Sequence, residues 1–81
     1  MDRVVSLSVG EMYHLGVGKD RIVYAGMPSE NVYSFAQMKH GFPYMGFAWN
    51  LFYPRKKTDI VIDGVRISVE NAGPDEIRFS V

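Results

Sequence analysis

The sequence predicts a small all-β or β-rich α+β single domain spanning residues 1–81. We expect about six antiparallel strands with a C-terminal meander and one short helix. Residues 59–81 alternate apolar and polar side chains around an Asp-Gly turn signal. Residues 42–53 hold six of the eleven aromatic side chains (five Phe, five Tyr and one Trp) and also alternate. A composition of 47% hydrophobic and 22% charged residues fits one globular domain.

The N-terminal part is predicted to form two strands separated by an extended segment and a turn. Residues 3–9 place apolar side chains at positions 5, 7 and 9 and serines at 6 and 8, a pattern typical of a half-buried strand. Residues 12–15 are expected to be extended, and the glycine-rich residues 16–20 indicate a turn. Residues 21–27 alternate again and form the second predicted strand.

Residues 29–40 are predicted to form the short helix. Ser29 can cap free backbone amides, and Glu30 suits the positive end of the helix dipole. Apolar side chains follow at helical spacing, and Gly41 suits the stop. A strand stays open as the alternative, because the residues at 32, 33 and 35 are β-branched or aromatic.

Residues 42–53 are predicted to form a strand around which the rest of the chain folds. One face of this strand carries large side chains. The small residues on the other face would let another backbone or a ligand come close. Whether the aromatic side chains form core or a stacking platform for bases stays open. The large face holds Met45, Phe47, Trp49, Leu51 and Tyr53, and the other holds Tyr44, Gly46, Ala48, Asn50 and Phe52, with Tyr44 and Phe52 expected to be most exposed.

The C-terminal third is predicted to be a three-stranded meander. Asp63-Gly64 indicates a two-residue hairpin turn between residues 59–63 and 65–70, and a loop over 71–75 leads into a strand over 76–81. We expect Ile62 opposite Val65, Ile60 opposite Ile67, Thr58 opposite Val69, Val69 opposite Ile77, Ile67 opposite Phe79 and Val65 opposite Val81. The outer face would carry Arg66, Ser68, Arg78 and Ser80.

Composition favours a non-enzymatic binding or regulatory protein. The nine basic and nine acidic side chains balance, so nucleic-acid binding would depend on a local patch. The chain has no cysteine, and its two histidines lack acidic neighbours at metal-ligand spacing, so we expect no catalytic centre, metal or cofactor. No apolar segment suggests a membrane span or a signal peptide, and we expect a cytoplasmic protein. Neutral charge with many aromatics favours a homo-oligomer, and we expect a homodimer joined through strand edges or the aromatic strand.

The basic run Arg55-Lys56-Lys57 directly follows Phe52 and Tyr53, and this is where basic and aromatic side chains adjoin. A protein that contacts phosphates at the end of a strand would use such a junction. The alternative is a solvated run that protects a hydrophobic strand from aggregation. The candidate residues for binding RNA or a protein partner are Arg55, Lys56, Lys57, Phe52, Tyr53 and Tyr44.

Residues 55–81 resemble the carbon storage regulator family of RNA-binding translational regulators. The similar features are the basic triplet, Ile60-Val61-Ile62, the alternating residues 65–69 and the segment 75–81. Residues 1–44 have no counterpart in that family. The resemblance implies an intertwined β-dimer that binds GGA-containing RNA, with the contacting role falling on Arg55, Lys56 and Lys57.

Two functions therefore stay open. One is a regulator that binds single-stranded RNA through the basic-aromatic strand end. The other is a protein-binding inhibitor or adaptor that acts through an exposed aromatic patch or a sheet edge.

Overall fold

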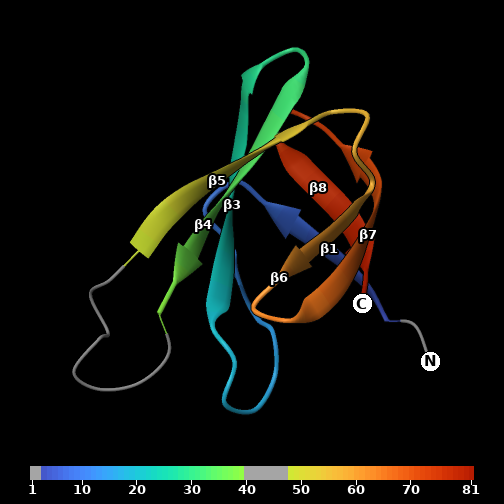
Figure 1. The fold of residues 1–81 in the computed structure, drawn as a ribbon. Helices are drawn as coiled ribbons and strands as arrows, with labels where there is room; N and C mark the ends of the chain where they lie inside the picture. Colours follow the sequence, from blue (N-terminus) through green and yellow to red (C-terminus); the bar gives the residue numbers. More distant parts are fainter. Residues whose placement is uncertain (1–2, 40–47) are drawn as a thin grey trace.

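The computed structural model describes residues 3–39 and 48–81, which form eight antiparallel strands in two four-stranded sheets (Figure 1). We call the two sheets the terminal sheet and the central sheet. The terminal sheet has the order β1 (Val4–Ser8), β8 (Glu76–Ser80), β7 (Val65–Ala72), β6 (Asp59–Ile62). The central sheet has the order β2 (Met12–His14), β3 (Arg21–Ser29), β4 (Val32–Met38), β5 (Ala48–Pro54). The all-β, antiparallel part of the prediction is confirmed, but the described residues form eight strands instead of about six. The two additional strands are β2, expected only as an extended segment, and β4, expected as a helix.

The helix predicted over residues 29–40 is wrong for the part that is described, because this segment lies in a β-hairpin. β3 extends to Ser29, β4 begins at Val32, and Ser29 pairs with Val32 across the turn. Strand alternation buries both Tyr33 and Phe35 on one face, which lets them reach the opposite sheet. The register shifts along β3 and interrupts the ladder near Pro28, which has no N–H to donate.

The two sheets are joined at two corners where the chain passes from one to the other. At the first corner, the backbone N–H of Gly10 donates to the Tyr24 carbonyl (2.9 Å). At the second corner, Arg55 donates to Asn31 in the central sheet, and Thr58 accepts from Val69 in the terminal sheet, both at 2.7 Å. Such bends let strands change sheets while their backbone groups stay paired.

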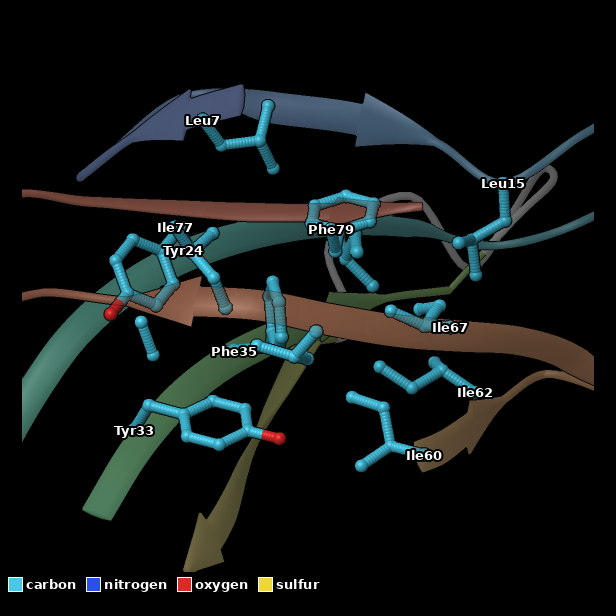
Figure 2. Close-up of a cluster of buried hydrophobic side chains, with 13 residues drawn as sticks. Leu7, Leu15, Tyr24, Tyr33, Phe35, Ile60, Ile62, Ile67, Ile77 and Phe79 are labelled. Atoms are coloured by element: carbon cyan, nitrogen blue, oxygen red, sulfur yellow. The ribbon is translucent and has the colours of Figure 1, made fainter. Parts of the chain in front are cut away.

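The core lies between the two sheets and is built around an aromatic cluster (Figure 2). The Phe35 ring contacts Tyr24, Tyr33 and Phe79, with centroids 5.6, 6.2 and 6.1 Å apart. All three contacts are edge-on or T-shaped, the arrangement that aromatic quadrupoles favour. The buried side chains are Leu7, Leu15, Ile22, Tyr24, Tyr33, Phe35, Ile60, Ile62, Ile67, Val69, Ala72, Ile77 and Phe79.

The aromatic stretch is not the centre of the fold, so that expectation is wrong for its described part. β5 pairs with β4 alone among the described strands and therefore lies at an edge of the central sheet. Leu51 and Tyr53 pack against the margin of the core, while Trp49, which lies on the same large face, is 41% exposed. Residues 42–47, including Tyr44, lie outside the described residues.

The predicted C-terminal hairpin is confirmed, with Ile62 opposite Val65 and Ile60 opposite Ile67. Asp63 and Gly64 have φ values of 51° and 75°, as a two-residue hairpin turn of this kind requires.

The predicted pairing of β7 with β8 is wrong by two residues, because Val69 lies opposite Phe79 instead of Ile77. A register shift after Val69 lets β7 continue to Ala72, which joins the core. A two-residue shift keeps every side chain on its face, so the predicted apolar face is buried or half-buried as expected.

Candidate functional site

The outer face of the central sheet is mostly apolar. Strand alternation directs one residue in two away from the core, and on this sheet the outward positions are aliphatic, aromatic or small. Met12 is 49% exposed and Phe52 is 60% exposed. Arg21 is the one charged residue at these outward strand positions within the described residues. The outward positions are Met12, His14, Arg21, Val23, Ala25, Val32, Ser34, Ala36, Met38, Ala48, Asn50, Phe52 and Pro54.

The outer face of the terminal sheet has the opposite character. Arg78 Nε lies 3.4 Å from Glu70 Oε1 in a solvent-exposed ion pair. Val4 and Val61, 50% and 62% exposed, are apolar side chains on this face, and they lie on the two opposite edge strands of the sheet. The outward charged residues are Asp59, Arg66, Glu70, Glu76 and Arg78. The outer face of the terminal sheet is therefore charged and suited to contact with water, whereas the outer face of the central sheet is mostly apolar.

A depression of about 250 Å³ lies on the central sheet beside Phe52. The Phe52 ring stands opposite Ser34, whose small side chain leaves space next to it. The irregular end of β3 closes the other side of the depression. Its lining residues are Ala25, Met27, Pro28, Ser34, Asn50 and Phe52.

The basic run lies at the second corner, and Arg55, Lys56 and Lys57 are all exposed. Arg55 Nη1 approaches the Glu30 carbonyl at 3.4 Å. A pocket of about 380 Å³ opens here, lined by Met27, Ser29, Glu30, Arg55 and Pro74. The pocket carries one basic and one acidic side chain, so it has no strong preference for an anion.

The two predicted aromatic members of the basic junction are separated by the strand alternation. Phe52 faces outward and is exposed, as predicted. Tyr53 faces inward and packs on Tyr33, with centroids 5.6 Å apart, and burial raises the pKa of the Tyr53 hydroxyl. The structure therefore leaves Phe52 as the described aromatic side chain that could stack on a ligand near the basic run.

Two buried tyrosines hold the loops around the pocket. The Tyr24 hydroxyl donates to the Gly73 carbonyl at 2.6 Å, and the Tyr33 hydroxyl donates to the Lys57 carbonyl at 2.5 Å. Burial, together with smaller effects of the neighbouring Tyr53 and Tyr24, raises the pKa of Tyr33 to about 12. Burial also raises the pKa of Tyr24, an effect that Arg55 partly offsets. Both hydroxyls are structural donors: Tyr33 holds the second corner, and Tyr24 holds the loop between β7 and β8.

A polar cluster connects the buried Asp20 and Gln37 to the exposed Asp63. Gln37 Nε2 donates to Asp20 Oδ2 at 2.8 Å, and the Asp20 backbone N–H donates to Asp63 Oδ2 at 2.7 Å. Over residues 3–39 and 48–81, no group of three or more His, Cys, Asp or Glu side chains could hold a metal ion. The same residues include no helix long and apolar enough to cross a membrane.

Sequence reasoning missed the apolar face of the central sheet. Its middle positions, Ala25, Ser34 and Ala36, are small and alternate with the buried Tyr24, Tyr33 and Phe35. A strand interpretation of residues 29–40 would have revealed that alternation, whereas the helical one concealed it.

Comparisons of the chain with protein-family models, with curated proteins and with solved structures find no significant match.

Proposed function

We propose that this protein is a non-enzymatic protein-binding module that acts through the outer face of the central sheet. The carrying observation is the contrast between the two outer faces: five outward charged residues on the terminal sheet against Arg21 alone at the outward strand positions described for the central sheet. An apolar face of this kind on a small soluble domain is typical of an interaction surface.

The partner best suited to this face is a protein with a complementary apolar patch. The depression beside Phe52 would accept one aliphatic side chain of that partner. The exposed Ala25 and Ala48 would let the partner backbone approach the sheet closely. Arg21, at the far end of the face, would contact the polar rim of the interface.

The test compares two variants at positions of similar exposure on opposite faces, Phe52 at 60% and Val61 at 62%. Phe52→Asp places a charge on the central sheet, and Val61→Asp, the control, places one on the terminal sheet. The parent and both variants are used to capture partners from native lysate treated with ribonuclease. We expect one stoichiometric protein that the parent and Val61→Asp retain and that Phe52→Asp loses. Equal retention by both variants would refute binding through the central sheet.

Single-stranded RNA binding is the second candidate, supported by three consecutive exposed cations directly after the exposed Phe52. Each phosphate contact on a single strand contributes about 0.7 to the slope of log affinity against log salt. Replacing Arg55, Lys56 and Lys57 by alanine should flatten the slope by roughly two units. Phe52→Ala should weaken binding by about 1–3 kcal/mol if the ring stacks on a base. Filter binding over a salt series measures both, and an unchanged slope would exclude RNA binding at this corner.

A further inference from the structure

The edge strand β5 has one row of backbone groups that no described strand pairs with. Arg55 donates its N–H to Asn31, and the same register places Tyr53 opposite Tyr33. In an antiparallel ladder this alternation points the odd-numbered residues of β5 toward β4. The N–H and C=O groups of Ala48, Asn50 and Phe52 therefore point to the open side of the sheet.

Over its described residues, this edge lacks the features that usually protect a strand edge. From Ala48 to Tyr53 it carries no charge, no proline and no glycine, and Pro54 marks its end. Of the other edge strands in the described structure, β2 is three residues long, and β6 is four residues long and begins with the charged Asp59. β1 has five residues, and two of them are serines. An uncharged edge of this length pairs readily with another strand.

We infer that the open edge of β5 pairs with β5 of a second copy of this chain, antiparallel about a two-fold axis at Asn50. In this register Ala48 lies opposite Phe52 of the second copy, and Asn50 lies opposite its own counterpart. The three free N–H groups of each copy then all meet a free carbonyl of the other. A register shifted by two residues would place Ala48 opposite Pro54, which has no N–H, and would leave a carbonyl of each copy without a donor.

The side chains also complement themselves in this register. Small Ala48 lies beside large Phe52 on the outer face, and Trp49 lies opposite Leu51 on the other face. The two Asn50 amides can hydrogen-bond to each other across the axis. No like charges oppose each other between Ala48 and Phe52, and the chain has a formal net charge of zero, so long-range repulsion is weak.

The pairing would join two central sheets into one continuous sheet and two apolar outer faces into one larger face. The inference concerns the strand edge and does not rest on the proposed function of the face. A monomeric protein could still bind a partner through the central sheet, and a dimer could form without such a partner.

The test is a charge exchange at Asn50, followed by sedimentation equilibrium at high micromolar concentration. Asn50 is exposed, so these variants should fold, and Asn50→Ser serves as the neutral control. We expect the parent and Asn50→Ser to dimerise, and Asn50→Lys or Asn50→Asp alone to do so on the order of tenfold more weakly. Mixing Asn50→Lys with Asn50→Asp should restore dimers of mixed composition, because opposite charges then meet at the axis.

Amide hydrogen exchange on the parent protein gives a second readout that needs no variant. The Ala48, Asn50 and Phe52 amides should become more protected as concentration rises, whereas the Leu51 amide, which points toward β4, should change less. A monomeric parent, dimerisation of Asn50→Lys equal to that of the parent, or a mixture that fails to associate would each overturn the inference.

Discussion

The carboxylate of Asp63 accepts a hydrogen bond from the backbone N–H of Asp20, with Oδ2 and N 2.7 Å apart. Asp63 occupies the β6–β7 turn of the terminal sheet, and Asp20 directly precedes β3 of the central sheet. The aspartate therefore has two roles. It adopts the positive φ of 51° that the turn requires, and it connects the two sheets at the end of the core.

Replacing Asp63 by glycine should separate these roles, because glycine tolerates the turn conformation but removes the acceptor. We expect Asp63→Gly to lower the free energy of unfolding by about 1–2 kcal/mol. Asp63→Asn keeps an oxygen acceptor and also tolerates positive φ, so it should cost less. Urea denaturation measures the free energy of unfolding of both variants and of the parent. If Asp63→Gly were as stable as the parent, the hydrogen bond to Asp20 would contribute nothing.

A methyl group at Gly26 should destabilise the fold more than one at Gly18. Both glycines have positive φ, 87° and 74°, so each alanine would pay about 1–2 kcal/mol of backbone strain. At Gly26 the added Cβ would also lie 3.3 Å from the Pro74 carbonyl oxygen and from a Val9 methyl, while nothing lies within 4 Å of it at Gly18. A thermal unfolding midpoint that falls further for Gly18→Ala than for Gly26→Ala would contradict this packing.

Truncation of two phenylalanines on adjacent strands should change the free energy of unfolding by very different amounts. Phe35 is fully buried among Tyr24, Tyr33 and Phe79, so Phe35→Ala should cost about 3–5 kcal/mol. A loss of this size is a large part of the total stability expected for a small domain. Phe52 is 60% exposed, and Phe52→Ala should change stability by no more than about 0.5 kcal/mol. Chemical denaturation of both variants checks the contrast, which an equal loss would refute.

Stability should fall as the pH rises from 10 toward 12. Unfolded tyrosines lose their protons near pH 10, whereas Tyr33 in the folded protein keeps its proton until about pH 12. Above pH 10 the unfolded state binds fewer protons than the folded state, so the free energy of unfolding decreases. The stabilisation is fully present below pH 10 and is lost as the pH passes through the folded pKa.

The variant Tyr33→Phe tests the source of this alkaline loss. It should unfold with a shallower pH dependence over the same range, since the group with the raised pKa is gone. It should also lose about 1 kcal/mol at neutral pH, because the Lys57 carbonyl loses its donor. Guanidinium denaturation over a pH series measures both effects. A slope identical to that of the parent would assign the alkaline loss to other groups, such as Tyr24 or Tyr53, whose pKa values burial also raises.

The part of the fold that follows from the sequence is the part governed by local interactions. The Asp63-Gly64 turn and the alternation on either side specify the β6–β7 hairpin and its register. Exposure of Phe52 and of the basic run also follows from alternation and from the hydration of charged side chains. The apolar outer face of the central sheet could not be predicted in the same way, because it depends on strands that come together only in the folded molecule.

By itself, the sequence determined an antiparallel β domain with its C-terminal hairpin, since a two-residue turn and period-two alternation act over a few neighbouring residues. The tertiary structure decided that residues 32–38 form a strand instead of a helix, because only extended backbone brings Tyr33 and Phe35 into the core with Phe79. It also decided the β7–β8 register and placed the aromatic β5 at a sheet edge. In each case several local conformations were compatible with the sequence, and burial against residues distant in the chain selected one of them.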